Sequence, residues 1–344
     1  MPGYVGRDWS VIDYKCYKLA GTDLWFRGPA PGALNTGKYF TVIGAAQTFG
    51  CFCEKPYSTL LAERLNVDVL NLGYSGAGPL FFALRPELLR YINRGAFCIV
   101  QIMSARSTGN SLLHNDEGLG YGRRTRDQVS VTAETVFDEL IRDGKARIPL
   151  IGDHWKNRLL RLLRIPIGSV LSVMRESRRN WLQQYVDFLE AIAVPKVLLW
   201  FSKRRPFYIP SYNERRALFG AFPHMVNHEM VGRIKSFADY YVECVTERGS
   251  PQVLIDRFTG LPTSIDLSAD VKPGRGNDTD GLRLYSGVWH ANSYYPSPEM
   301  HIDAANALFE SCARMLGTVA RHSQKKDGDG RSTLISPVLP TYHG

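Results

Sequence analysis

The stretch Tyr39–Gly44 (YFTVIG) decides the fold class of this chain, together with the small-residue turn 45–50 (AAQTFG) that follows it. The run is almost continuously apolar, without alternation of apolar and polar residues. Such a run is typical of a parallel strand that is buried on both faces of a sheet. Further runs of this character are residues 67–72, 97–103, 196–202 and 252–257. We therefore predict one parallel sheet of five strands.

Helical patterns separate these runs, and the alternation defines the architecture. The helices are expected at Tyr57–Leu65 and at residues 80–93, 181–193, 225–247 and 299–320. Strands that alternate with helices form a parallel sheet with right-handed crossovers, and the helices cover both of its faces. We therefore expect a three-layer α/β/α domain.

The chain divides into three parts on this pattern, and the second part carries an insertion. Residues 1–37 form an N-terminal extension, and residues 38–320 form the α/β domain. Residues from about 104 to 180 interrupt the alternation, which predicts a helical insertion that acts as a lid or as a contact in a homo-oligomer. Its basic run 155–163 (WKNRLLRLL) indicates a helix at a membrane surface or a helix packed on the core. Residues 321–344 are polar and rich in Gly and Pro, which predicts an extended or disordered arm.

The composition is that of a soluble globular protein. Of the 344 residues, 44% are hydrophobic and 22% are charged, which excludes a disordered chain, a collagen-like fibre and a coiled coil. No apolar run approaches the roughly 20 residues that cross a bilayer, so we expect no stable membrane insertion. The first residues lack the basic and apolar regions of a signal peptide, which predicts a cytoplasmic protein with its six Cys reduced.

The charge balance favours anionic partners. Lys and Arg number 42 against 33 Asp and Glu, which makes a formal net charge of +9. Such a surplus attracts anions in general. The aromatic residues do not interleave with the basic runs, and the sequence shows no nucleic-acid-binding motif. We therefore expect an anionic ligand and no nucleic acid.

Small and polar residues follow the predicted strands. They form the turns 44–50, 73–78 and 104–111, and a further turn, 292–297, directly precedes the last helix. The carboxyl ends of parallel strands meet at one edge of the sheet, where ligands bind in open α/β folds. Gly-rich turns let backbone N–H groups approach a ligand closely. The sequence therefore predicts a ligand site at this edge.

The first two turns resemble motifs of the SGNH (GDSL-type) hydrolases, a family of esterases and acyl-modifying enzymes with a flavodoxin-like α/β/α fold. The family's G-D-S-x-T-x-G motif resembles residues 44–50 (GAAQTFG), which keep Gly44 and Thr48 but place Ala46 where the nucleophilic Ser stands. Its N-x-G-x-x-G motif resembles residues 71–76, in which Gly76 matches the oxyanion-hole Gly.

The other two turns resemble the remaining motifs in the family's order. The G-x-N motif, whose Asn belongs to the oxyanion hole, resembles Gly109 and Asn110 with looser spacing. The D-x-x-H-P-S motif resembles residues 292–297 (NSYYPS), with Asn292 for Asp and Tyr295 for His. The resemblance implies a flavodoxin-like sheet of five strands.

The departures from the family concern its catalytic triad. Ala46 has no hydroxyl, Asn292 carries no charge, and Tyr295 titrates too high to be a base near neutral pH. Ester hydrolysis by the family's route needs all three groups. The chain therefore either binds its ligand without cleaving it or uses other residues.

Four side chains are candidates for catalysis by another route. Ser75 lies in a relaxed G-x-S-x-[GA] turn, which indicates a nucleophile or a turn residue beneath the pocket. His290 and His301 bracket the last turn, so each is a candidate base or a hydrogen-bonded loop residue. Tyr295, at the position of the family's His, is the fourth candidate.

No residue pattern indicates a metal or a cofactor. His224 and His228 stand four residues apart in a predicted helix, but a third metal ligand is not evident. Cys51 and Cys53 lie too close for a strain-free disulfide and have no second pair for zinc, which indicates buried free thiols.

Several cations are expected at the carboxyl edge of the sheet. Arg106 follows the third predicted strand, Lys203, Arg204 and Arg205 follow the fourth, and Arg257 ends the fifth. Guanidinium groups suit carboxylate, phosphate or sulfate, although they also cap helices or pair with Asp and Glu. We predict an anion site made by Arg106, Arg204 and Arg205. The turn residues expected to line it are Gly44, Ala46, Gln47, Thr48, Gly76 and Asn110.

Three functions remain open. The first is a protein with a replaced triad that binds a small anionic or carbohydrate ligand, or modifies it by acyl or sulfo transfer. The carbohydrate part is implied by the family resemblance alone. The second is a non-catalytic, oligomeric interaction protein. The third is an esterase that has recruited Ser75.

Overall fold

A five-stranded parallel sheet lies at the centre of the computed structural model, which describes residues 3–32, 34–146, 168–210, 212, 214–267 and 287–328. The strands are β3 (Tyr39–Gly44), β4 (Asp68–Gly73), β5 (Cys98–Gln101), β9 (Lys196–Ser202) and β10 (Tyr240–Val245). Their order is β10-β9-β5-β3-β4, and each neighbouring pair is parallel. This is the doubly wound order of flavodoxin-like folds, so the predicted fold class is confirmed.

The fifth strand is β10 and not the predicted run 252–257. Of that run only β11 (Gln252–Val253) is a strand, and it pairs antiparallel with β14 (Ala291–Asn292). The predicted helix 225–247 is also wrong, because it comprises α10 (His228–Ile234), the 3-10 helix η2 (Lys235–Phe237) and then β10. An edge strand is covered less than a central one, and within β10 only Cys244 is buried. Its exposed positions accept polar residues, which conceal the apolar run that marks the other strands.

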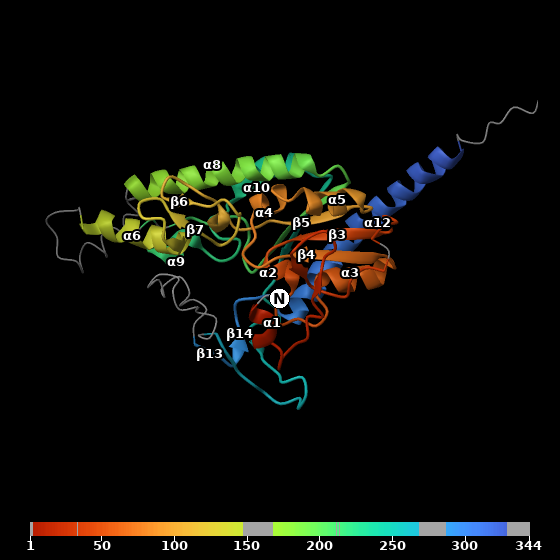
Figure 1. Ribbon diagram of the computed structural model, residues 1–344, viewed down its shortest axis with the longest axis horizontal. Helices are drawn as coiled ribbons and strands as arrows, with labels where there is room; N and C mark the ends of the chain where they lie inside the picture. The colour runs from red at the N-terminus through yellow and green to blue at the C-terminus, as the bar shows by residue number, and fades with distance from the viewer. Residues whose placement is uncertain are drawn as a thin grey trace, which may run out of the picture.

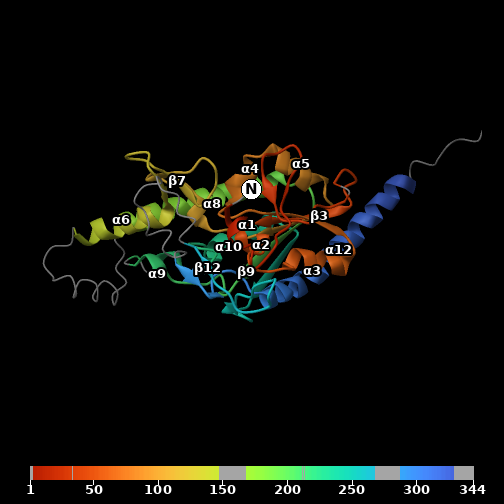
Figure 2. The same cartoon turned by 60° about the horizontal axis from the view of Figure 1, so that its bottom comes forward.

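Helices cover both faces of the sheet (Figures 1 and 2). One face carries α4 (Pro79–Ala83), α5 (Pro86–Arg94), α8 (Gly168–Ala191) and α10, and the other carries α3 (Tyr57–Leu65) and α12 (Pro298–Gly328). Alternate residues of β3 supply the two cores, with Tyr39 and Ile43 on the first side and Phe40 and Val42 on the second. The predicted helix 80–93 is interrupted before Pro86, because proline disfavours helical backbone in the residue before it.

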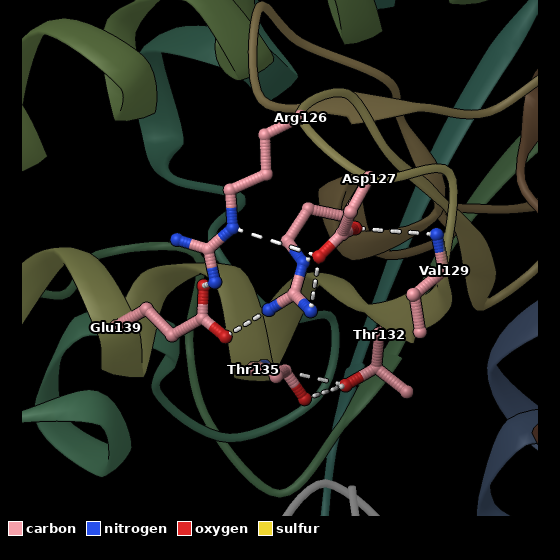
Figure 3. A network of polar contacts seen from close by, with 7 residues as sticks. Arg126, Asp127, Val129, Thr132, Thr135 and Glu139 are labelled. Carbon is pink, nitrogen blue, oxygen red and sulfur yellow. Dashed lines mark hydrogen bonds and ion pairs between the residues drawn. The ribbon is translucent and has the colours of Figure 1, made fainter. Parts of the chain in front are cut away.

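The insertion contains a small antiparallel sheet as well as helices. The strands β6 (Leu113–His114), β7 (Tyr121–Arg124) and β8 (Ser130–Thr132) lead into α6 (Ala133–Ala146), which contacts α8 and α9 (Arg215–Phe219). Arg126 pairs with Asp127 and Glu139 and so ties the β7–β8 hairpin to α6 (Figure 3). Arg124 pairs with the same carboxylates. The basic run 155–163 lies outside the described residues, and a contact between copies stays a prediction.

The N-terminal extension folds back onto the turn after β3. It contains α1 (Gly3–Arg7) and the hairpin of β1 (Tyr17–Lys18) and β2 (Trp25–Phe26). The buried guanidinium of Arg27 donates to backbone carbonyl oxygens at four positions, namely Phe49, Gly50, Cys53 and Glu54. A buried cation needs such acceptors to offset its lost hydration. This contact fixes the extension against the edge of the sheet where β3 ends.

The last helix is longer than predicted. The helix α12 continues through Gly328, so residues 321–328 of the expected arm are helical, and residues 329–344 lie outside the described residues. Before it, β12 (Ile265–Asp266) pairs with β13 (Val288–Trp289). Within the described ranges, no helix combines the length and the apolar character that a membrane span requires.

Candidate functional site

A cavity lies at the carboxyl edge of the sheet, outside the ends of β3, β4 and β5. We call it the edge cavity, and its volume is about 210 Å³. Three turns line it with Ala45, Ala46 and Gln47, with Ser75, Gly76 and Ala77, and with Ser104, Arg106 and Ser107. The other lining residues are Arg7, Cys51, Phe222, Leu267, Tyr294 and Tyr295. The chain leaves β3 and β5 toward opposite faces of the sheet, and this switch point is where open α/β sheets bind ligands.

The turn after β3 is held by buried polar contacts behind the cavity. Thr48 donates its hydroxyl to Oε1 of Gln101 at 2.8 Å, and the N–H of Ala45 donates to the same oxygen at 3.1 Å. A Cβ on Gly44 would lie 2.3 Å from the Thr48 hydroxyl oxygen, so only glycine fits beneath α2 (Ala46–Phe49). Gly44 and Thr48, which we predicted to bind ligand, therefore shape this turn and do not line the cavity.

The turn after β4 is joined to both neighbouring turns. Asn71 donates from Nδ2 to the carbonyl oxygen of Thr48 at 3.0 Å. Gly76 has a φ of +77°, and its carbonyl oxygen accepts the hydroxyl of Ser107 at 2.7 Å. Ser75 is exposed and lines the cavity, but among the described residues no histidine lines it as well. The cavity therefore offers Ser75 no histidine base.

Asn110 lies away from the edge cavity, contrary to the prediction. Its Oδ1 accepts the N–H groups of Leu112 and Leu113, and its Nδ2 donates to the hydroxyl of Ser177 on α8 at 3.0 Å. The 3-10 helix η1 (Ala105–Ser107) turns the chain toward the insertion, so Asn110 belongs to the insertion's own packing. The looser spacing of this motif in the sequence was the sign of that difference.

The turn before α12 places Tyr295 in the cavity without making it a base. The Oδ1 of Asn292 accepts the N–H of Tyr294 and the N–H of Tyr295, and its Nδ2 donates to the carbonyl oxygen of Tyr295. Burial raises the pKa of Tyr295 well above its usual value. The turn is thus held by Asn292, and neither Asn292 nor the neutral Tyr295 phenol supplies a general base.

The two candidate bases His290 and His301 lie outside the cavity. His290 is exposed. His301 on α12 is fully buried between Tyr57 and Phe201, and its Nδ1 accepts the N–H of Tyr57 at 3.2 Å. Burial lowers the pKa of His301 to about 3. His301 therefore packs the core as a neutral ring and does not serve the edge cavity.

His224 contacts a residue that lines the edge cavity, Ser104. Its backbone N–H donates to the Ser104 hydroxyl at 2.9 Å, and its Nδ1 lies 3.2 Å from the same oxygen. His224 precedes α10, whereas the exposed His228 is its first residue, so the two do not share one helix face. Among the described residues no group of three metal-ligating side chains occurs. Burial, with Arg106 and Arg204 nearby, lowers the pKa of His224 well below its usual value.

Two guanidinium groups line the edge cavity. Arg106 pairs with Glu134 at 3.1 Å, and Arg7 pairs with the buried Asp8 at 2.6 Å. The hydroxyl of Tyr14 donates to Asp8 at 2.7 Å, so a further group of the extension holds this pair in place. The sequence indicated Arg106, which follows β5. Nothing in the sequence indicated Arg7, because only the folding back of the extension brings it to the cavity.

The other predicted cations have different roles. Arg204 donates to the backbone carbonyl oxygens of Arg205, Ala221, Pro223 and Val226, and its guanidinium lies over the rings of Trp200 and Tyr208. Arg205 is exposed. Arg257 lies over the ring of Trp9, 3.8 Å from its centre. None of these three residues lines the edge cavity. Arg204 and Arg205 follow β9, where the chain turns away from the cavity, and Arg257 does not follow a strand of the central sheet.

A second cavity, which we call the side cavity, adjoins the first. Its volume is about 520 Å³. It shares Gln47, Phe222 and Tyr294 with the edge cavity. Its other lining residues are Phe201, Ser202, Lys203, Arg216, Gly220, Ala221, His224, Trp289, Ser293, Pro296 and Met300. Cys51 and Cys53 are buried free thiols, as the sequence predicted.

Comparison with known proteins gives a family and one weak structural likeness. Residues 4–114 and 154–261 match the model of the family described as Domain of unknown function (DUF6473). None of the curated proteins matches the chain. A solved structure of a carbohydrate esterase family 2 enzyme with a carbohydrate binding domain, from Corynascus thermopiles (Myceliophthora fergusii), is 12% identical. The match covers 84% of this chain and 68% of that one with a TM-score of 0.33, which supports no conclusion about this chain.

Proposed function

The chain belongs to the DUF6473 family of domains of unknown function, and we propose that its edge cavity binds a small anionic ligand through Arg7 and Arg106. We propose further that the chain is a relative of the SGNH hydrolases that has lost their triad, with Ala46, Asn292 and Tyr295 in its place. Under this proposal the edge cavity recognises an acidic group and does not cleave an ester by the family's route.

The observation that carries the proposal is the convergence of two guanidinium groups from distant segments of the chain on one small cavity. Arg7 comes from the extension and Arg106 from the turn after β5, and no Asp or Glu is among the described residues that line the cavity. The pairs with Asp8 and Glu134 fix the orientation of each guanidinium before a ligand arrives. A planar, fixed guanidinium loses little freedom when it binds a carboxylate, phosphate or sulfate.

The experiment is calorimetric titration with inorganic sulfate, inorganic phosphate and glucuronic acid at two salt concentrations. Replacing Arg106 alone would leave Glu134 buried without its cation, so the informative variant is the double substitution Arg106→Gln and Glu134→Gln. One charge-assisted hydrogen bond contributes about 1.5–3 kcal/mol, so the affinity should fall about tenfold to a hundredfold. The exposed Arg205→Gln serves as the matched control. Equal binding of all three ligands by wild type and double variant would overturn the proposal.

A second candidate function follows from the contact between Ser104 and His224. Ser104 lines the edge cavity, and its hydroxyl lies within hydrogen-bond distance of Nδ1 of His224. In an acyl transfer, the Ser104 oxygen would attack the ester carbonyl while its proton passes to Nδ1 of His224, and the alcohol would leave with that same proton. The acyl group then stays on Ser104 until a water or an acceptor hydroxyl attacks it, gives its proton to Nδ1 and releases Ser104, which takes the proton back. The lowered pKa keeps His224 neutral at pH 7 but also makes it a weak base, which favours the binding function.

Hydrolysis of p-nitrophenyl acetate separates the two functions. Activity that is lost in Ser104→Ala and kept in Ser75→Ala would support acyl transfer by Ser104. Activity lost only in Ser75→Ala would instead identify the recruited serine that the sequence suggested. The binding function alone predicts that wild type and both variants hydrolyse the ester no faster than buffer.

A further inference from the structure

The edge cavity and the side cavity share three lining residues. Gln47, Phe222 and Tyr294 line both, so the two cavities lie on either side of the same side chains. The side cavity, at about 520 Å³, is the larger of the two. A ligand that filled only the edge cavity, at about 210 Å³, would leave the larger space unused. The size of the side cavity therefore bears on which anion fits this protein.

The walls of the side cavity suit an apolar group. Aromatic and aliphatic side chains from separate elements make up much of the lining, among them Phe201, Trp289 and Met300. Its basic side chains are satisfied or solvated, because the ammonium of Lys203 donates to the Ser250 hydroxyl and the Ser293 carbonyl, both at 2.6 Å, and Arg216 is exposed. No Asp or Glu is among its described lining residues. An acyl chain or an aromatic ring would bury apolar surface there.

Gln47 stands at the junction with an unsatisfied acceptor. Its side chain is buried, with 3% of the residue exposed, and Oε1 has no hydrogen-bond partner within the described structure. A buried amide oxygen without a partner is a costly feature that proteins rarely keep without reason. Because Gln47 lines both cavities, a ligand that spans them would pass beside it. A hydroxyl or amide N–H on that ligand would satisfy the oxygen once the buried Gln47 amide turns toward the cavity.

We infer that the ligand is an amphipathic anion whose acidic group lies in the edge cavity, whose donor group meets Gln47, and whose acyl chain or ring fills the side cavity. This inference rests on the proposed function, since it takes the acidic group to bind Arg7 and Arg106. N-acyl amino acids, hydroxylated fatty acids and their sulfated or phosphorylated counterparts have this chemistry. Inorganic sulfate occupies only the first part of the site.

The test is calorimetric titration with N-acylglycines of increasing chain length, from acetyl through butanoyl and hexanoyl to octanoyl. Each carries one carboxylate and one amide N–H. Burial of a methylene contributes about 0.8 kcal/mol, so the affinity should rise about fourfold for each added methylene until the side cavity is full. Fatty acids of matched length lack the amide N–H and should bind more weakly.

Two variants locate the parts of the ligand. Ala221 is exposed and lines the side cavity but not the edge cavity, so Ala221→Trp should abolish the dependence on chain length. Sulfate titration of this variant reports whether its edge cavity is intact. Gln47→Met should remove the preference for N-acylglycines over fatty acids. It should also stabilise the ligand-free protein, because it removes the unsatisfied acceptor.

The outcomes separate this inference from the function on which it rests. Sulfate binding that depends on Arg106, with an affinity independent of chain length, would refute the inference and leave the proposed function standing. If the affinity still rises with acyl-chain length in Ala221→Trp, the acyl chain binds outside the side cavity, and the inference is refuted. Absence of binding by sulfate and by every N-acylglycine would refute both.

Discussion

His301→Asn is expected to make the protein less sensitive to acid between pH 8 and pH 5. In the folded chain the pKa of His301 is about 3, because the ring is fully buried and Arg27 lies nearby. In the unfolded chain an ordinary His has a pKa of about 6.5. The unfolded state therefore binds more protons than the folded state as the pH falls below 6.5, so stability falls with the pH. The contribution of the neutral ring is fully present above pH 6.5.

The magnitude follows from the two pKa values. Integration from pH 8 to pH 5 gives a loss of about 2 kcal/mol in the free energy of unfolding from His301 alone. That figure holds for any folded pKa well below 5. His224 has a lowered pKa as well and adds a loss of the same sign, but it remains in both proteins. The loss between pH 8 and pH 5 should therefore be about 2 kcal/mol smaller in His301→Asn than in wild type.

Urea denaturation at the two pH values measures this difference. The Asn amide oxygen can accept the N–H of Tyr57, which His301 accepts in the wild type. His290→Asn is the matched control, since His290 is exposed and the substitution should leave the acid sensitivity unchanged. If wild type and His301→Asn lose equal stability between pH 8 and pH 5, the His301 ring takes up a proton in the folded protein. His301 would then be wrongly excluded as a candidate base.

Three further substitutions distinguish structural from ligand-binding residues, each measured by urea denaturation and by sulfate titration. Arg27→Met should cost about 3 kcal/mol of stability, because it removes the buried hydrogen bonds to the carbonyl oxygens of Gly50 and Cys53. It should also weaken sulfate binding, because the extension that carries Arg7 loses its anchor. An unchanged sulfate affinity would show that Arg7 does not bind. Arg204→Met should cost about 2 kcal/mol and leave sulfate binding unchanged, whereas weaker binding would restore the sequence prediction for that residue. Asn110→Ala should cost about 1 kcal/mol through the lost turn contacts, again without effect on sulfate, and a loss of binding would return Asn110 to the site.

The structure decides which of the candidate catalytic residues lie at the edge cavity and which do not. The sequence offers Ser75 as a nucleophile, His290 and His301 as bases, and Tyr295 at the position of the family's His. In the structure Ser75 and Tyr295 line the edge cavity, His290 is exposed, and His301 is in the core. Burial and neighbouring charge decide such roles, and neither is a property of a short motif.

The sequence by itself determined the fold class, most of the central sheet and part of the edge cavity. Central strands are buried on both faces, so β3 and β9 stand out as apolar runs and were predicted at their observed bounds. The turns after β3, β4 and β5 lie at the carboxyl edge in any parallel sheet, which is why Ala46, Gly76 and Arg106 could be predicted to meet.

Only the tertiary structure decided which distant segments complete the site. Arg7 reaches the edge cavity because the extension packs back through Arg27, and Ser104 meets His224 because the loop before α10 returns to the end of β5. The edge strand β10 escaped prediction for a related reason, since its half-exposed positions admit polar residues. A buried strand imposes its apolar pattern locally, whereas the path of a loop follows from packing against residues far along the chain. The side cavity combines such loops with the ends of β9 and α12, and this combination has no signature in the sequence.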